Sequence, residues 1–121
     1  MNQFSRSELL LGINNMDKLK QSKILIFGIG GVGSYVCEAL VRCGIENFVL
    51  VDSDKISLSN VNRQIHSTLK TVGLSKVEVM KERMLDINPT CNITIYEEFY
   101  LPDKHSDIIN DDISYIVDAI D

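Results

Sequence analysis

The chain has 121 residues, of which 45% are hydrophobic and 24% charged, and its formal net charge is −5. This size and balance fit a single globular domain, and no run reaches the roughly eighteen apolar residues of a membrane span. The acidic charge argues against a chain that holds nucleic acid by phosphate neutralisation alone, since that mode needs clustered Lys and Arg. The first residues lack the apolar region of a signal peptide, so we expect a cytoplasmic location.

The three cysteines, Cys37, Cys43 and Cys91, are odd in number and include no CxxC pair. Neither a disulfide framework nor a zinc site is therefore indicated. We expect all three to be small buried apolar side chains.

Residues 1–20 are predicted to form a helical arm ahead of the main domain, residues 21–121. The arm contains three consecutive leucines, and Gly12 breaks its first helix. Arg6 lies near the start of that helix, where a cation opposes the helix dipole. From these residues alone, a solvated arginine is the simplest interpretation.

The segment from Lys23 to Asp52 is predicted to form a strand, a glycine-rich turn, a helix and a second strand. The first apolar run leads into four glycines, Gly28, Gly30, Gly31 and Gly33. Apolar residues then recur at helical spacing from about Val32 to about Cys43. Gly44 follows at the position of a left-handed C-terminal cap.

A glycine turn between a strand and a helix is typical of nucleotide-binding folds. Gly28 permits a tight turn, Gly30 lets a phosphate approach the main chain, and Gly33 allows close packing of the helix. Free amides at the helix start then face an anion. Asp52 ends the next strand, where a carboxylate can accept hydrogen bonds from ribose hydroxyls. This stretch predicts nucleotide binding and leaves the nucleotide open, so an NAD(P)-binding oxidoreductase remains an alternative.

Residues 53–76 are polar and show no sustained periodicity, and loops longer than about 12–15 residues are usually functional or disordered. The segment carries two cations, Arg63 and Lys76, together with the amides Asn60, Asn62 and Gln64. Such cations neutralise the negative charge that develops on a phosphate chain under attack. An NAD dehydrogenase needs nothing of this kind after its second strand. Asp54 either assists a metal or nucleotide or caps the loop.

The next element is predicted to be a helix that starts with a capping box, Ser75 and Glu78, and ends before Pro89. Lys76 then occupies the first helical position. It is either a tolerated surface charge or a cation aimed at a bound anion. Beyond this helix we expect a strand over 92–99, a short helix over 103–110 and a strand over 113–120.

Four strands joined by helical crossovers predict an α/β fold. We expect a Rossmann-like, doubly wound, mainly parallel sheet with helices on both faces, which gives three αβα layers. Ligands of such sheets bind beyond the carboxyl ends of the strands, where the glycine turn, Asp52, Asp54 and Asp121 are predicted to lie. Because the chain stops on an apolar strand at Asp121, we expect a truncated domain, the N-terminal fragment of a longer one.

The motifs occur in the order GIGGVGS, VDSDKISLSNVNRQ, VGLSKVEV, INP and VDAID. This series resembles the ubiquitin-activating-enzyme-like (ThiF-type) adenylating superfamily over nearly the whole chain. The opening FSRSELLLG, the NRQIH ending and the EEFYLPDK segment are most similar to the tRNA threonylcarbamoyladenosine dehydratases within it. Those enzymes use ATP to close the threonylcarbamoyl group of a modified adenosine onto itself through an activated carboxylate.

The resemblance implies that the chain uses ATP and Mg²⁺, and it assigns roles to residues of this sequence. The residues that it gives to the nucleotide are Gly28, Gly30, Gly31, Gly33, Asp52, Asp54, Asn60, Arg63, Gln64, Lys76 and Arg6. Arg63 and Lys76 would stabilise the transition state as a carboxylate attacks the α-phosphate. Asp121 matches the magnesium ligand and joins them as a catalytic residue. Arg6 matches an arginine that reaches the ATP of the other subunit in a homodimer.

The resemblance also implies the partners. The first is a tRNA, held mainly by a C-terminal half that follows this segment in the family. The alternative is the C-terminal glycine of a ubiquitin-like sulfur carrier of thiamine or molybdopterin synthesis. A binding module or inert fold fragment is a further alternative, and we expect the fragment alone to be inactive. His66, after NRQ, is interpreted as structural rather than catalytic, and His105 as a surface residue.

Overall fold

The computed structural model describes residues 3, 17–18, 20–99 and 107–120. Its elements are β1 (Lys23–Phe27), α3 (Gly31–Cys43), β2 (Asn47–Val51), the 3-10 helix η1 (Leu58–Asn60), α4 (Lys76–Ile87), β3 (Asn92–Tyr96) and β4 (Tyr115–Asp118). Most of the predicted N-terminal arm, Arg6 included, lies outside the described residues, as does Asp121.

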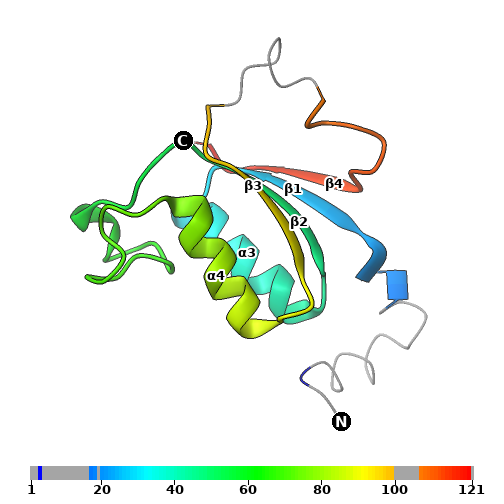
Figure 1. Cartoon of the computed structure of the whole chain (residues 1–121), viewed down its shortest axis with the longest axis horizontal. Coiled ribbons are helices and arrows are strands. Elements are labelled where there is room, and N and C mark those ends of the chain that lie inside the picture. The colour runs from blue at the N-terminus through cyan, green and yellow to red at the C-terminus, as the bar shows by residue number, and fades with distance from the viewer. Residues whose placement is uncertain (1–2, 4–16, 19, 100–106, 121) are drawn as a thin grey trace.

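The four strands form one parallel sheet in the order β3-β2-β1-β4 (Figure 1). The predicted α/β fold with a parallel sheet is therefore confirmed. The last two strands are shorter than expected, since β3 ends at Tyr96 and β4 covers Tyr115–Asp118. Strands β2 and β4 pair with opposite edges of β1. The order in which successive strands are added to the sheet therefore reverses at β1. In such sheets a ligand crevice opens outside the carboxyl ends at this point.

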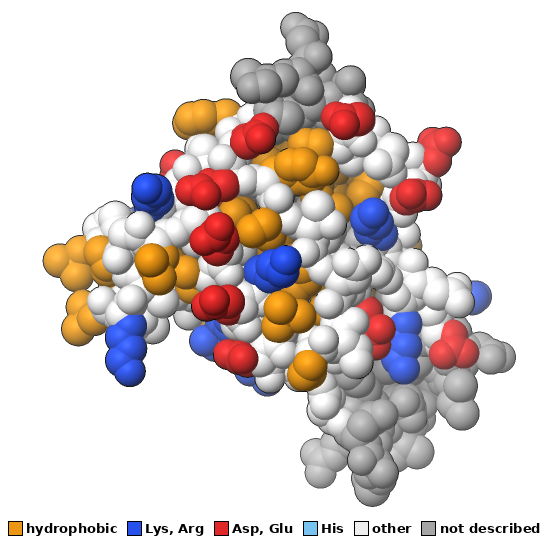
Figure 2. Space-filling model, viewed as in Figure 1, with side chains coloured by type: hydrophobic (Ala, Val, Ile, Leu, Met, Phe, Trp, Pro, Cys, Tyr) orange, Lys and Arg blue, Asp and Glu red, His pale blue; other side chains and the backbone are white. Residues whose placement is uncertain are grey.

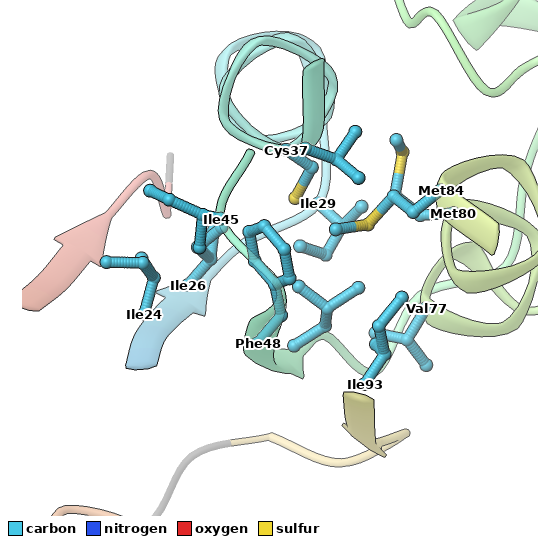
Figure 3. Packing of buried hydrophobic residues seen from close by; sticks show 12 residues of the cluster. Ile24, Ile26, Ile29, Cys37, Ile45, Phe48, Val77, Met80, Met84 and Ile93 are labelled. Carbon is cyan, nitrogen blue, oxygen red and sulfur yellow. The ribbon is translucent and has the colours of Figure 1, made fainter. Parts of the chain in front are cut away.

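Helices α3 and α4 pack on the same face of the sheet (Figure 1). Their apolar side chains meet those of β1, β2 and β3 around Phe48, which is fully buried (Figure 3). The buried cluster consists of Ile24, Ile26, Ile29, Cys37, Val41, Ile45, Phe48, Leu50, Val77, Met80, Met84 and Ile93. This burial is the main apolar contribution to stability, at about 25 cal/mol per Å² removed from water.

The opposite face of the sheet packs against the turn that precedes β4. Ile108 is buried there among the strand side chains Leu25, Phe27, Val49 and Val51. The helix predicted over 103–110 is wrong within its described part, because residues 107–110 form turns and a bend. Asn110 accounts for this: its Nδ2 donates to the carbonyl of Asp107, and its Oδ1 accepts from the amide of Asp112. Such local bonds compete with a helix.

The ends of the two helices follow the sequence with one exception. Helix α3 ends at Gly44, whose φ of 106° is the left-handed cap that was predicted. Helix α4 begins at Lys76 as expected, but the predicted capping box is wrong, since Ser75 makes no side-chain cap bond. The amide of Lys76 donates to the carbonyl of Asp54 at 3.1 Å, so neighbouring main chain satisfies the first amide of the helix.

The cysteines differ in burial, contrary to the expectation that all three are buried. Cys37 lies in the core, Cys91 is intermediate, and Cys43, the last residue of α3, is exposed. Loss of water around Cys37 raises the pKa of its thiol to about 12. The same cause raises the pKa of the Cys91 thiol to about 11.

A buried carboxylate joins the two helices. Glu38 of α3 accepts a 2.6 Å bond from Nε of Arg83 on α4 and a 3.0 Å bond from Nη2 of Arg42. The carboxylate side chain is 8% exposed, whereas the side chain of Arg83 is 38% and that of Arg42 is 60% exposed. Arg83 therefore gives the main compensation for burying this charge, because the exposed Arg42 is well solvated.

Candidate functional site

Two glycines of the turn after β1 are required by packing. Gly28 has a φ of +89°, and a Cβ there would lie 2.7 Å from the main-chain carbon of Ala119, beyond β4. A Cβ at Gly33 would overlap the carbonyl oxygen of Gly28. The segment after β4 can therefore approach the turn only with glycine at position 28, and helix α3 can approach it only with glycine at position 33.

The other two glycines are not required by packing. A Cβ at Gly30 would meet nothing nearer than Nε2 of Gln64, at 3.6 Å, and one at Gly31 nothing nearer than the carbonyl of Arg63, at 3.9 Å. Main chain that is open at the start of a helix exposes amides without intrahelical partners, and these bind anions. The open side of the turn is thus suited to phosphates.

Asp52 supports this turn from the end of β2. Its Oδ2 accepts from the amide of Ile29 at 2.7 Å, and its Oδ1 accepts from the amide of Asp54 at 2.8 Å. Each carboxylate oxygen has a second lone-pair direction. Asp52 therefore orients the turn and can still accept hydrogen bonds from a ligand.

A cleft of about 240 Å³ opens at the carboxyl edge of the sheet. It is lined by Gly28, Gly30, Val51, Asp52, Ser53, Asp54, Gln64, Lys76, Glu98, Phe99, Ala119 and Ile120. Six of the residues proposed from the sequence are among them: Gly28, Gly30, Asp52, Asp54, Gln64 and Lys76. The cleft thus brings together the glycine turn, the end of β2, residues of the 53–76 loop and the start of α4.

Lys76 is a buried cation at the edge of the cleft. The residue is 6% exposed, and Nζ lies 3.9 Å from Oδ2 of Asp54, whose side chain is 63% exposed. Of the two interpretations left open by the sequence, a surface charge is wrong. A buried ammonium group with one distant and solvated carboxylate partner is well suited to a second anion.

Gln64 also faces the cleft, and it is 6% exposed. Within the described part of the chain, its Oε1 has no hydrogen-bond partner. A buried amide oxygen without a partner is costly, so a ligand that donates a hydrogen bond would stabilise this site.

Arg63 and Asn60 do not line the cleft. The guanidinium of Arg63 is exposed and donates from Nη1 to the carbonyl of Ser59 at 2.8 Å and to Oδ1 of Asn62 at 3.3 Å. Asn60 is buried, and its Oδ1 accepts from the amide of Ser57 at 2.8 Å, which closes the capping box of η1. In this structure both side chains form hydrogen bonds within the 53–76 loop.

The loop also exposes apolar side chains. Figure 2 shows hydrophobic side chains at the tip of the lobe that residues 53–75 form at the left. Leu58, Leu69 and Leu74 are each more than half exposed. The lobe therefore presents apolar side chains at its tip, and on its inner side His66 bonds the carbonyl of Ile29 in the glycine turn.

The sequence missed several residues of the cleft, among them Ser53, Glu98, Phe99 and Ile120. Ser53 follows β2 after Asp52, Glu98 and Phe99 follow β3, and Ile120 follows β4. Position just beyond a strand end was the available signal, because parallel strands bring their carboxyl ends to one edge.

No metal site is formed by the described residues alone, in which no three His, Cys, Asp or Glu side chains gather. The predicted magnesium ligand, Asp121, and the predicted arm arginine, Arg6, lie outside them. None of the described helices is long and apolar enough to cross a membrane.

Known proteins resemble this chain along its whole length. A match to the ThiF family covers residues 4–121. The tRNA threonylcarbamoyladenosine dehydratase of Bacillus subtilis strain 168 is 42% identical over 121 residues, which are 100% of this chain and 48% of that protein. A crystal structure of the Escherichia coli tRNA N6-threonylcarbamoyladenosine dehydratase in complex with ATP has a TM-score of 0.94 and 41% identity. It covers 98% of this chain, which matches 49% of that one.

A relative that matches a smaller part of the chain has a different name. The probable molybdopterin-synthase adenylyltransferase of Porphyra purpurea is 44% identical over 84 residues, which are 69% of this chain and 22% of that protein. The chain spans about half the length of the curated dehydratases it matches.

Proposed function

Because this chain belongs to the ThiF family, we propose that it forms the ATP-binding part of an enzyme that adenylates a carboxylate. The observation that carries the proposal is the cleft, in which the buried Lys76 shares one sheet edge with the glycine turn and Asp52. A fixed cation beside free helix amides suits a chain of phosphates. The E. coli relative with this fold was solved in complex with ATP.

The proposed acceptor is the threonylcarbamoyl group of a modified adenosine in tRNA, as the names of the bacterial relatives suggest. Its carboxylate attacks the α-phosphate of ATP, and pyrophosphate leaves. An internal nucleophile of the same group then attacks the acyl carbon, and AMP leaves with one carboxylate oxygen. The net change is loss of water and closure of a ring.

The residues of the cleft suit these steps. Gly30 and Gly31 would let the phosphates approach the main chain, since no side chain covers it there. Asp52 would accept from the ribose hydroxyls through its remaining lone pairs. Lys76 would neutralise charge on the triphosphate as pyrophosphate leaves, and Asp54, its neighbour, would turn toward the nucleotide.

The roles of Arg63 and Asn60 require rearrangement or a second contact. For Arg63 to stabilise the transition state, its exposed guanidinium must leave Ser59 and turn into the cleft that its neighbour Gln64 already lines. Asn60 would bind the triphosphate through its side-chain Nδ2, because its Oδ1 already accepts a hydrogen bond from the main-chain amide of Ser57.

Mg²⁺ would enter with ATP as part of the substrate. Mg²⁺ commonly uses one or two protein carboxylates plus phosphate oxygens, and the cleft supplies a carboxylate of this kind in Asp54. Asp121 is proposed as the metal ligand and Arg6 as a residue given to the ATP of a second subunit, so the proposed assembly is a homodimer.

A tRNA substrate implies contacts beyond this chain and a cytoplasmic setting. The chain is acidic, and acidic and basic side chains are interspersed on the face shown in Figure 2. Binding of a polyanion needs clustered cations. We therefore propose that the tRNA is held mainly outside the surface described here.

An ATP–pyrophosphate exchange assay tests the acceptor. The protein would be given tRNA that carries threonylcarbamoyladenosine, the same tRNA without the modification, or a ubiquitin-like sulfur carrier. We expect exchange with the modified tRNA alone. Exchange with the carrier alone would contradict the proposed acceptor and indicate activation of a sulfur carrier, as the name of the P. purpurea relative suggests for that protein.

A titration tests the nucleotide. Calorimetry with ATP·Mg²⁺ and with NAD would be run on the same preparation. We expect binding of ATP·Mg²⁺. Binding of NAD without ATP would overturn adenylation in favour of an oxidoreductase.

A further inference from the structure

The residue between the first two glycines of the turn is held from two sides by side chains of distant segments. The amide of Ile29 donates to Oδ2 of Asp52 at 2.7 Å, and its carbonyl lies 2.7 Å from Nε2 of His66. The side chain of Ile29 is fully buried in the core. The two peptide groups on either side of Ile29 are thus fixed in orientation.

The hydrogen-bond pattern of His66 defines its tautomer. A carbonyl oxygen can only accept, so Nε2 carries the proton and donates to Ile29. Nδ1 is then the acceptor for the hydroxyl of Ser67, at 3.2 Å. Both ring nitrogens are satisfied in the neutral form, and the residue is 2% exposed. His66 is therefore built as a fixed donor and has no free nitrogen for proton transfer.

His66 also connects the two halves of the cleft. It lies two residues after Gln64, whose Nε2 is the nearest atom to a Cβ built at Gly30. The amide of Ser67 donates to the carbonyl of Gln64 at 2.9 Å, so the positions of His66 and Gln64 are linked through one turn. A bond from His66 to Ile29 thus sets the distance between the 53–76 loop and the glycine turn.

We propose that His66 is a positioning residue for the nucleotide site. Together with Asp52 it clamps Ile29, which directs the amides after Gly30 toward the phosphates and docks the loop that carries Gln64 and Lys76. The inference rests on the proposed function for its ligand, ATP. The lowered pKa of His66, caused first by burial, agrees with a ring that stays neutral in this role.

Two substitutions at position 66 distinguish the role of the hydrogen bond to Ile29 from the packing role of the side chain. His66→Leu keeps a large side chain and removes the donor. His66→Gln keeps an N–H donor at a similar distance from the main chain. We expect ATP·Mg²⁺ affinity to fall about tenfold in His66→Leu, the equivalent of one lost hydrogen bond, and to stay within about threefold of the parent in His66→Gln.

A core variant controls for general loss of stability. Met84→Ala removes a buried side chain of α4 that lies in the core cluster rather than in the cleft. At a temperature where all variants are folded, we expect Met84→Ala to bind ATP·Mg²⁺ normally. Equal losses of affinity in Met84→Ala and His66→Leu, or no rescue by Gln, would overturn the positioning role.

Amide hydrogen exchange of the ligand-free protein tests the clamp without ATP. In His66→Leu we expect the amide of Ile29, which donates to Asp52, to exchange at least tenfold faster, while those in the middle of α4 change little. Unchanged exchange at the Ile29 amide would refute the clamp even if the protein binds ATP. Faster exchange in a protein that binds no ATP would support the clamp and refute the proposed function.

Discussion

The carbonyl oxygen of Gly28 occupies the space that a Cβ at Gly33 would need. Neither atom can shift easily, because Gly28 directly follows β1 and its amide bonds the carbonyl of Val51, while Gly33 lies in the first turn of α3. Alanine at position 33 must therefore displace the helix from the sheet.

We predict that Gly33→Ala destabilises the protein by at least about 3 kcal/mol, the upper range for overpacking, because backbone opposes backbone here. Gly30→Ala is the matched control, since its Cβ meets only the end of the Gln64 side chain. It should cost less than about 1 kcal/mol but weaken ATP·Mg²⁺ binding. Urea denaturation and calorimetry measure the two effects. Equal stabilities of the two variants would contradict the packing argument.

The ion pair between the helices gives a second prediction. Arg83→Ala removes a 2.6 Å charge-assisted bond and leaves the buried Glu38 with one exposed partner. We expect a loss of about 1.5–3 kcal/mol. Arg42→Ala should lose only about 0.3–0.5 kcal/mol, as for exposed pairs one turn apart on a helix. Denaturant unfolding of both variants, with the Glu38→Ala double mutants, checks this order, and the reverse order would be inconsistent with it.

Thiol reactivity should follow burial. The thiolate is the reactive form, and burial raises the pKa of Cys37 to about 12 and that of Cys91 to about 11. At pH 8 we expect one thiol, that of Cys43, to react rapidly with a disulfide reagent, and the others to react after unfolding. Cys43→Ser should abolish the rapid phase. A rapid phase that persists in this variant would show that another cysteine is accessible.

His66 gives stability a dependence on pH. Burial lowers its pKa below 6.5, opposed by the bond to Ile29; the charges of Lys76 and Arg83 lower it further, and Asp52 opposes them. The folded state then binds fewer protons than the unfolded state between the two pKa values. The contribution of neutral His66 to the free energy of unfolding is complete above pH 6.5. It is lost as the pH falls toward the pKa that His66 has in the folded state.

The measurement is the denaturation midpoint of the parent and of His66→Gln from pH 7.5 down to pH 5. We expect the parent to lose more stability than the variant, which cannot titrate at this position. Parallel profiles would mean that other groups cause the change.

Arg63 can be tested for catalysis separately from folding. We expect Arg63→Ala to slow ATP–pyrophosphate exchange at least about a hundredfold, as for loss of one preorganised electrostatic group. Lys70→Ala, an exposed cation of the same loop, should leave the rate unchanged. Normal exchange in Arg63→Ala would remove this residue from the proposed mechanism.

Local signals predicted the elements of the fold well. The boundaries of α3 follow from helical spacing and Gly44, and Pro89 limits α4. The capping box predicted at Ser75 was wrong, and the bond that the first helical amide does make, from Lys76 to the carbonyl of Asp54, joins segments that no local sequence window contains. The helix expected at 103–110 failed in its described part because Asn110 bonds the local main chain.

The site was predictable where it depends on strand ends and less so where it depends on tertiary contacts. Asp52 and the glycines follow directly from the strand-turn-helix pattern. The contact between His66 and Ile29 joins two segments with no shared local signal, so only the folded chain reveals it. Phe99 reaches the cleft because β3 pairs with β2, which the sequence does not encode as a motif.

The position of β1 between β2 and β4 also bears on the order of folding. Ile24 pairs with Phe48, which is near in sequence, and with Tyr115, which is much farther along the chain. Closing the longer loop costs about 1 kcal/mol more entropy. The unit of β1, α3 and β2 can therefore form before β4 pairs with β1. Since Ala119 follows β4 and packs against Gly28, we expect the binding cleft to be among the last of the described parts to assemble.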